Sequence, residues 1–267
     1  MKKQIATAIT AAALVAVPAT SMVGSAQAAP AAPVTNVADA LPHALGLTSV
    51  HNARDLGGYR TTDGLTVVNG LVFRTGNLSS LSPADASILA SKHVATAIDL
   101  RTALERTIQP ERTIPGATSQ WNDVLGTANP VDMLFLSGAY VDFVTSPGAR
   151  AAFSKTLKTI ETNAAAGKAT LFHCSAGKDR TGWTAAVLLT VLGVDRTTVD
   201  QDYLLSNKFN NSSQADPLNG VNIDWLNAAF NAATKYYGSF DNYVHHGLGL
   251  SAADVASLKA HLLTGHA

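Results

Sequence analysis

The chain has 267 residues, of which 46% are hydrophobic and 14% charged, enough to bury one sizeable core. Its 19 basic and 19 acidic residues give a formal net charge of zero, which excludes the basic excess of a nucleic-acid-binding protein and the charge blocks of interaction tails. We therefore expect one globular domain with no nucleic-acid partner.

Residues 1–28 are typical of a secretory signal peptide. Two lysines precede an apolar run over residues 5–17, and an Ala-Gln-Ala sequence ends the segment. The run is shorter than the roughly 20 residues that span a bilayer, which favours export over membrane anchoring. We expect cleavage after Ala28, secretion, a flexible lead-in over residues 29–40, and a folded domain over residues 41–267.

A stretch with paired glycines opens the folded domain. It reads Asn-Ala-Arg-Asp-Leu-Gly-Gly-Tyr over residues 52–59. Paired glycines permit positive φ angles or a close backbone approach, and Arg54 beside Asp55 indicates an ordered turn. We expect this stretch to have a structural rather than a catalytic role.

A hairpin, a helix and a buried strand follow. Residues 65–73 hold two apolar runs around Asn69-Gly70, the dipeptide preferred by type I′ turns, which predicts a β-hairpin. Ser82 before Pro83 predicts the start of a helix that continues to about residue 92. The apolar run over residues 94–100 predicts a strand.

Charged residues gather at the end of that strand. Asp99-Leu100-Arg101 is followed by Glu105, and the carboxyl ends of strands are where open α/β sheets bind ligands. Asp99 and Arg101 are therefore candidate substrate-binding residues. The alternative is an Asp99–Arg101–Glu105 ion network that only orders the loop, and the sequence leaves both open.

The apolar pattern that marks helices and strands weakens over residues 109–130, which we interpret as loops. We assign the three aspartates of this region and just beyond it to surface positions or helix caps; they are Asp123, Asp132 and Asp142. Apolar residues at helical spacing then predict an amphipathic helix over residues 148–162 that packs on the sheet.

The single cysteine lies in a loop between a strand and a helix. Residues 169–172 predict a short buried strand, and residues 183–192 predict an apolar helix that Gly193 ends. The loop between them, His173 to Gly182, holds Cys174, two cations and two glycines. It follows the carboxyl end of a strand and opens a helix.

This position favours anion binding and a reactive thiol. A helix N-terminus presents unpaired N–H groups and partial positive charge, and both a helix N-terminus and nearby cations lower the pKa of a thiol from about 8.5. Arg180 lies six residues after Cys174 and can offer a planar fork to two phosphate oxygens. A lone cysteine in an exported protein forms no internal disulfide, so its thiol stays free.

Helices and one loop complete the chain. Thr197 and Asp200 are placed as a variant capping box for the first of these helices, and residues 209–220 are polar and predict a loop. The adjacent His245 and His246 lack further ligands at a suitable spacing, so they are weak metal candidates. The predicted helices cover residues 197–206, 223–237 and 252–263.

The sequence His-Cys, five residues, Arg-Thr resembles the signature loop of the cysteine-dependent protein tyrosine phosphatase superfamily. The narrower Ala-Gly-Lys-Asp-Arg-Thr-Gly is similar to the bacterial tyrosine/serine phosphatase family, some of whose members also act on phosphoinositides. Residues 52–59, 99–101 and 202–207 resemble further segments of that family. The resemblance implies a single α/β domain of the protein tyrosine phosphatase type, with a central, mostly parallel sheet flanked by helices.

The resemblance also implies roles for the loop residues. The Cys174 thiolate would attack phosphorus to form a cysteinyl-phosphate, which water then hydrolyses. Asp179 would protonate the leaving oxygen, with Asp99 in reserve, and Thr181 would donate to the sulfur or cap the helix. Arg180 and the loop would hold the phosphate, and the substrate-binding candidates of the loop are Ser175, Ala176, Gly177 and Lys178.

We expect a monomeric phosphatase that needs no metal or other cofactor. Phosphotyrosine is the first candidate substrate, followed by phosphoserine, phosphothreonine and phosphoinositides, the last because Lys178 resembles a feature of phosphoinositide phosphatases. Rhodanese-like sulfurtransferases have fewer residues between cysteine and arginine, and non-catalytic phosphoresidue-binding relatives usually lack one of the two. In some relatives a helical pair near residues 223–263 covers the active site, which is a hypothesis for this chain.

Overall fold

The computed structural model describes residues 43–126 and 136–265, all within one unit of the chain that spans residues 36–267. The predicted signal peptide and lead-in lie outside the described residues, and so does Asp132. Within the described ranges, none of the helices has the length and apolar character needed to cross a membrane.

A five-stranded sheet with the order β1-β3-β6-β4-β5 lies at the centre of the described residues. Strands β3, β6, β4 and β5 run parallel, and β1 is antiparallel to β3. The sheet confirms the predicted α/β class. Its strands are β1 (Arg54–Asp55), β3 (Val72–Thr75), β4 (Val94–Asp99), β5 (Thr118–Trp121) and β6 (Ala169–His173).

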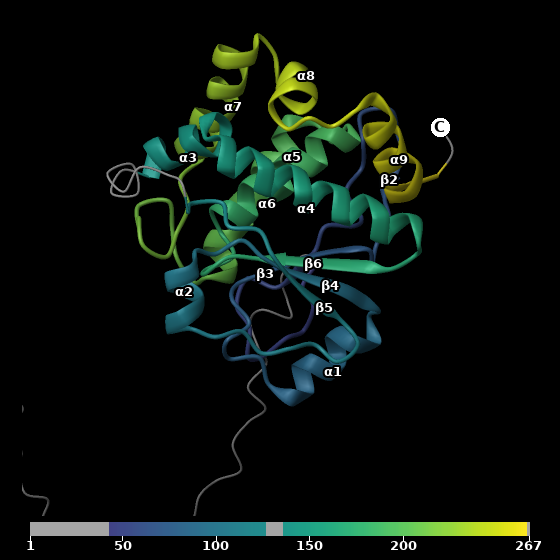
Figure 1. Cartoon of the computed structure of the whole chain (residues 1–267), viewed down its shortest axis with the longest axis vertical. Coiled ribbons are helices and arrows are strands. Elements are labelled where there is room, and N and C mark those ends of the chain that lie inside the picture. Colours follow the sequence, from purple (N-terminus) through teal and green to yellow (C-terminus); the bar gives the residue numbers. More distant parts are fainter. Residues whose placement is uncertain (1–42, 127–135, 266–267) are drawn as a thin grey trace, which may run out of the picture. The chain divides into compact units, whose positions relative to one another are not determined.

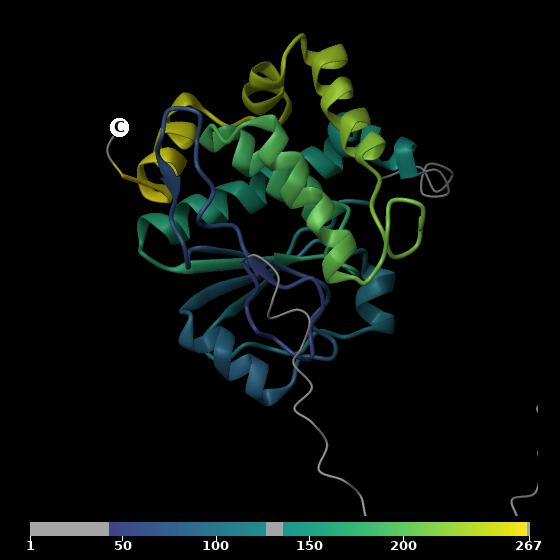
Figure 2. The same ribbon diagram turned by 180° about the vertical axis from the view of Figure 1, so that it is seen from behind.

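Helices flank this sheet on both faces. In Figure 1, α4, α5 and α6 lie on one face and α1 on the other; the view from behind in Figure 2 shows the same two layers, with α7 and α8 on the far side of α5 and α6 from the sheet. The helices are α1 (Pro83–Ser91), α2 (Ala103–Ile108), α3 (Leu136–Thr145), α4 (Pro147–Ala165), α5 (Arg180–Leu192), α6 (Arg196–Phe209), α7 (Ile223–Tyr237), α8 (Phe240–Asn242) and α9 (Ala252–Leu262), with a π-helical turn over Tyr243–Gly247.

The core has a part on each face of the sheet. Successive side chains of a strand point to opposite faces, so Leu171 of β6 joins the cluster with α1 and Phe172 joins the larger cluster with α4 and α5. Trp183 is fully buried in the larger cluster, with its ring centroid 5.1 Å from that of Phe230 and 6.0 Å from that of Tyr243. The sheet and α5 are thereby fixed on both sides of the cysteine loop.

Most of the predicted helices are confirmed. Ser82 Oγ accepts a hydrogen bond from the Asp85 N–H at 3.1 Å and caps α1, as its sequence predicts. Helix α7 has the predicted bounds, and Gly193 ends α5 in the left-handed conformation at φ +93°. Helix α5 begins three residues before the predicted start, directly at Arg180.

The predicted hairpin over residues 65–73 is wrong. Its first half is β2 (Thr66–Val67), which pairs with β7 (Leu263–Thr264), whereas its second half is β3, which pairs with β1 and β6. The turn is not of type I′, because of the two central residues only Gly70 has a positive φ, +83°. Burial of β3 between two other strands outweighs the local preference of the Asn-Gly dipeptide.

Two further predictions need correction. The region interpreted as loops contains β5, whose residues are mostly exposed and therefore carry no apolar signal. The N-cap of α6 is Asp195, which accepts from the Thr198 N–H at 3.0 Å, and Thr197 and Asp200 form no capping box. Asp200 instead pairs with Arg196 at 2.6 Å.

Candidate active site

The cysteine loop connects the carboxyl end of β6 to the start of α5, and its carbonyl groups bind the surrounding scaffold. The Ser175 carbonyl accepts from the backbone and side-chain N–H groups of Asn77 at 3.0 and 2.9 Å. The Gly177 carbonyl accepts from Asn52 Nδ2 at 2.7 Å and from Arg74 Nη2 at 2.9 Å. The loop is therefore held from outside through its oxygen atoms.

The N–H groups of the same loop have no such partners. Within residues 43–126 and 136–265, no hydrogen bond uses a backbone N–H of residues 175–179 as its donor. Unpaired N–H groups that follow one another and lead into a helix N-terminus form a cradle for an anion. The loop thus presents its donors to a ligand and its acceptors to the protein.

Gly177 is required by this loop conformation. Its φ is +65°, and a Cβ atom on it would lie 2.4 Å from the Thr75 carbonyl oxygen. Both a left-handed backbone and a backbone contact at this distance exclude other residues. The second glycine position predicted from sequence in the loop, Gly182, lies inside the first turn of α5 against the Tyr203 ring.

A buried ion cluster supports the loop through Arg74, which donates to the Gly177 carbonyl. Asp202 of α6 binds Arg54 Nε at 2.9 Å and Arg74 Nη1 at 2.7 Å, and all three side chains are at most 2% exposed. Burial alone would raise the pKa of Asp202, but the charges of Arg54 and Arg74 outweigh it and lower the pKa to about 2. Arg54, from the stretch 52–59 for which we predict a structural role, thereby links β1 to α6.

Cys174 is free and 1% exposed, directly after β6. The preceding His173 is fully buried, with Nδ1 3.2 Å from the Cys174 carbonyl oxygen and Nε2 2.8 Å from Glu111 Oε1. His173 therefore fixes the backbone beside the thiol, and Glu111 in turn fixes the His173 ring.

Glu105 holds the arginine of the loop. Its two carboxylate oxygens accept from Nη1 and Nη2 of Arg180, each at 2.7 Å, and one of them also accepts from Ser175 Oγ. Burial would lower the pKa of Arg180, but the hydrogen bond to Glu105 and the negative charge of that carboxylate outweigh it and raise the pKa above its ordinary value. Arg180 Nε donates to no described residue and stays available to a ligand.

Asp179 contacts α3, and Lys178 contacts both the loop before α7 and α7 itself. Asp179 Oδ1 accepts from the Tyr140 hydroxyl at 3.0 Å, and Lys178 Nζ lies 3.1 Å from Asp179 Oδ2. Lys178 is only 5% exposed, donates to the Gly220 carbonyl at 2.9 Å and lies 5.4 Å from the Trp225 ring centroid. Lys178, a substrate-binding candidate from sequence, is therefore a buried cation whose ammonium group already has protein partners.

Thr181 is the second residue of α5 and fully buried. Its Oγ1 has no hydrogen-bond partner among the described residues, so the expected contacts to the Cys174 sulfur and to the helix end are both absent from this part of the chain. The N-cap position belongs to Asp179 instead.

Asp99 and Arg101 bind each other. Arg101 donates to both oxygens of Asp99 at 2.9 and 2.8 Å, and each side chain is at most 1% exposed. Burial raises the pKa of Asp99, yet the hydrogen bonds from Arg101 outweigh it and lower the pKa. The network that orders the loop thus forms, but Arg106 rather than Glu105 is its third member, 3.1 Å from Asp99.

Asp99, Glu111 and His173 place ligand atoms within 4.8 Å of one another. Arg101 occupies both Asp99 oxygens, and His173 Nε2 is taken by Glu111, so we interpret the group as an ion-pair network. His245 Nδ1 lies 2.6 Å from the Leu250 carbonyl oxygen, a local hydrogen bond rather than a shared ligand site with His246. Independence of metal stays a prediction.

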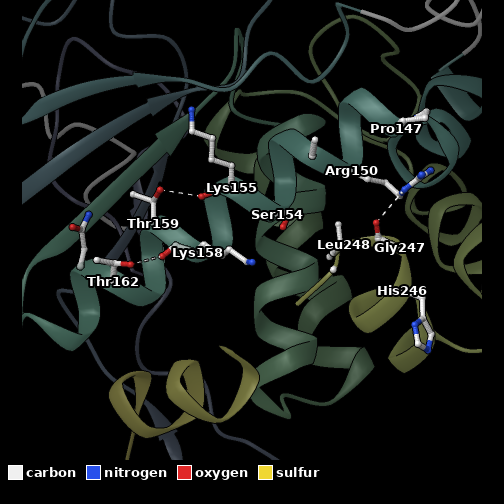
Figure 3. Close-up of a pocket in the computed structure, with 13 residues that line it drawn as sticks. Pro147, Arg150, Ser154, Lys155, Lys158, Thr159, Thr162, His246, Gly247 and Leu248 are labelled. Atoms are coloured by element: carbon white, nitrogen blue, oxygen red, sulfur yellow. Dashed lines mark hydrogen bonds between the residues drawn. The ribbon is translucent and has the colours of Figure 1, made fainter. Parts of the chain in front are cut away.

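Two cavities differ in their relation to the loop. One of about 630 Å³ lies between α4 and residues 246–249, where Figure 3 shows Arg150, Lys155 and Lys158 along the helix; it does not reach the cysteine. A smaller one of about 280 Å³ opens directly at the loop. It is lined by His51, Gly76, Asn77, Ser175, Ala176, Asn210 and Asn219.

Sequence reasoning missed several residues of this site. The sequence analysis places Glu105 only in an Asp99–Arg101–Glu105 ion network, although Thr102-x-x-Glu105 is a readable capping box that places the glutamate at a helix start beside a strand end. Tyr140 contacts Asp179 and Tyr203 contacts Tyr140, and both lie far from Asp179 in sequence. Tyr140 belongs to no motif, and nothing in the family-like stretch over residues 202–207 marks Tyr203 as its partner.

The chain is similar to known tyrosine phosphatases. A protein of Cupriavidus necator provisionally named a tyrosine-protein phosphatase is 33% identical over 255 residues, covering 84% of this chain and 89% of its own. The triple specificity protein phosphatase PtpB of Mycobacterium tuberculosis is 29% identical over 175 residues, covering 55% of this chain and 62% of its own.

Among solved structures, TpbA of P. aeruginosa in complex with pTyr gives a TM-score of 0.38 at 14% identity, covering 79% of this chain and 94% of that one. A family model described as the tyrosine phosphatase family matches residues 45–264. The chain therefore belongs to the tyrosine phosphatase family.

Proposed function

We propose that this phosphatase hydrolyses phosphate monoesters, phosphotyrosine first, through a cysteinyl-phosphate on Cys174. The observation that carries the proposal concerns the polar groups of the loop backbone. The Ser175 and Gly177 carbonyls accept hydrogen bonds from the scaffold, whereas the N–H groups of residues 175–179 have no partner among the described residues. A phosphate with its charged oxygens in that cradle would have phosphorus facing the thiolate.

In the first step the Cys174 sulfur would form a bond to phosphorus while the bond from phosphorus to the ester oxygen breaks. The N–H groups of the cradle and Arg180 Nε would hold the equatorial oxygens as charge spreads over them. Asp179 would give its proton to the departing oxygen, so that an alcohol or phenol leaves rather than its anion.

In the second step a water molecule would attack the phosphorus, the bond from sulfur to phosphorus would break, and Asp179 would take the water proton. Thr181 Oγ1, a buried hydroxyl with no partner among the described residues, would have to move toward the Cys174 sulfur to donate to the thiolate that leaves. Asp99 is a poor reserve acid because Arg101 and Arg106 hold it as a carboxylate.

The substrate preference belongs to the same proposal. Phosphoserine, phosphothreonine and phosphoinositides remain further candidates, and the relative named a triple specificity phosphatase supports a broad range. Lys178 would have to leave the Gly220 carbonyl to bind a lipid headgroup, which favours phosphotyrosine over phosphoinositides as the first substrate. We also propose export of the protein, from the pattern of residues 1–28.

The test measures kcat/KM for an aryl phosphate with wild type and Cys174→Ser, each with a chelator present. We expect wild-type activity to be unaffected by the chelator and Cys174→Ser to lose essentially all of it. Activity that survives in Cys174→Ser would contradict the covalent mechanism. Transfer of sulfur from thiosulfate to cyanide, or phosphotyrosine binding without turnover by wild type, would favour the sulfurtransferase or binding-module alternatives.

A further inference from the structure

Two buried tyrosines approach the carboxyl group of Asp179 from outside the loop. Tyr140 of α3 and Tyr203 of α6 are at most 1% exposed, and their hydroxyl oxygens lie 2.7 Å apart. The Tyr140 hydroxyl is also 3.0 Å from Asp179 Oδ1. Two helices thus deliver a linked pair of hydroxyls to one oxygen of the proposed general acid.

The hydrogen bonds that link Tyr203, Tyr140 and Asp179 have one favoured donor direction. Each hydroxyl has one proton to donate. Among the described residues, the other acceptor within reach of the Tyr203 hydroxyl is the Asn222 carbonyl at 3.4 Å, much farther than the Tyr140 hydroxyl at 2.7 Å. Tyr203 therefore donates to Tyr140, and Tyr140 donates to Asp179 Oδ1.

Burial keeps both hydroxyls in the donating form. Removal from water raises the pKa of Tyr140 and of Tyr203 well above 10, and the negative charge of Asp179 adds to the effect. Neither hydroxyl ionises at neutral pH. The donor to Oδ1 is thus permanent.

The two oxygens of Asp179 are thereby made unequal. Lys178 Nζ lies 3.1 Å from Oδ2 and 3.3 Å from Oδ1, so the lysine hardly distinguishes them, whereas Tyr140 contacts Oδ1. We propose that Tyr140, supported by Tyr203, is a positioning residue that fills Oδ1 and directs the transferable proton of Asp179 to Oδ2. This inference rests on the proposed function, in which Asp179 protonates the leaving oxygen.

Both tyrosines also pack in the core, so a test must separate the hydroxyl from the ring. The Tyr140 ring centroid lies 4.9 Å from that of Phe143 and 6.4 Å from that of Trp225. Phenylalanine keeps these contacts and removes only the hydroxyl. Tyr243 supplies a matched control, because it is equally buried and its hydroxyl bonds Trp183 Nε1 at 3.3 Å rather than the loop.

The experiment compares kcat/KM for phenyl phosphate, whose leaving group needs a proton, with kcat/KM for a dinitrophenyl phosphate, whose leaving group does not. The ratio of the two is measured on wild type, Tyr140→Phe, Tyr203→Phe and Tyr243→Phe. We expect the phenyl to dinitrophenyl ratio to fall about tenfold in Tyr140→Phe and about threefold in Tyr203→Phe, a part of the 10²- to 10⁴-fold effect of a general acid. Tyr243→Phe should keep the wild-type ratio.

The ratio does not depend on how much of a variant is folded, because both substrates report on the same active molecules. Adding Tyr140→Phe to Asp179→Asn should change the ratio no further, since the tyrosine acts through the carboxyl group. An unchanged ratio in Tyr140→Phe, or an equal further fall in the Asp179→Asn background, would overturn the inference while leaving Cys174-dependent hydrolysis intact. Activity that persists in Cys174→Ser would instead defeat the proposed function itself.

Discussion

Arg180 is the residue on which the phosphate clamp depends, and its orientation is set by another side chain. Glu105 engages the end of the guanidinium through Nη1 and Nη2, while Nε donates to no described residue. A bidentate pair of this kind fixes the plane of the guanidinium, which a single contact does not. The loop therefore presents one defined edge of Arg180 to an anion.

Replacement of Glu105 by alanine should release this orientation. We expect Glu105→Ala to lower kcat/KM for an aryl phosphate by about tenfold, because a mobile guanidinium pays an ordering cost when it binds phosphate. Steady-state kinetics measure the effect. The control is Glu161→Ala on α4, because Glu161 accepts a hydrogen bond from Ser257 and not from a residue of the loop. A Glu105→Ala variant with wild-type kcat/KM would contradict the positioning role.

At the scale of elements, Asp202 joins three parts of the fold. It lies on α6 and binds Arg54 of β1 and Arg74 of β3, and Arg74 in turn holds the Gly177 carbonyl. Removal of one partner from a buried ion cluster leaves the others charged and unpaired. The cost of such a change falls on the sheet, the helix and the loop together.

We expect Asp202→Asn to reduce the free energy of unfolding by about 3–5 kcal/mol, the range for breaking a buried ion pair. Asp200→Asn on the same helix is the matched control. It removes a partly exposed pair with Arg196 and should cost less than about 1 kcal/mol. Urea denaturation measures both, and equal losses in the two variants would contradict a special role for the cluster.

The same cluster predicts a direction for the pH dependence of stability. The pKa of Asp202 is about 2 in the fold and 3.8 when unperturbed, so its stabilising effect is fully present above about pH 4. It is lost as the pH falls through 2, because both states then bind the proton. The difference in unfolding free energy between wild type and Asp202→Asn should therefore shrink from pH 5 to pH 2.

Elements with local signals could be predicted from the sequence. Ser82-Pro83 and Gly193 mark helix ends through their own backbone preferences, and the apolar runs at β4 and β6 mark buried strands. Strand β2 could not be placed, since its partner β7 lies at the opposite end of the described chain. Such pairing depends on tertiary contacts that a dipeptide preference does not encode.

At the scale of the whole molecule, the loop motif predicted the chemistry and the fold supplied its supports. Cys174 and Arg180 follow from spacing within one loop. Glu105 and Tyr140 reach the loop from two other helices, and Asp202 acts on it through Arg74. The burial of Lys178 could not be predicted from its charge, because it depends on a contact with the Gly220 carbonyl, which lies far away in sequence. Residues that act through another residue leave no local pattern in the sequence.

The measurement that tests the central claim most directly is mass spectrometry of the enzyme quenched during turnover of an aryl phosphate. We predict that one phosphoryl group is found on the peptide that contains Cys174 and that Cys174→Ser carries none. With a dinitrophenyl phosphate, whose leaving group needs no proton, the phosphoryl group should accumulate in Asp179→Asn, because only hydrolysis of the intermediate is then slowed. A phosphoryl group on another residue, or turnover without any phosphorylated enzyme, would contradict the account.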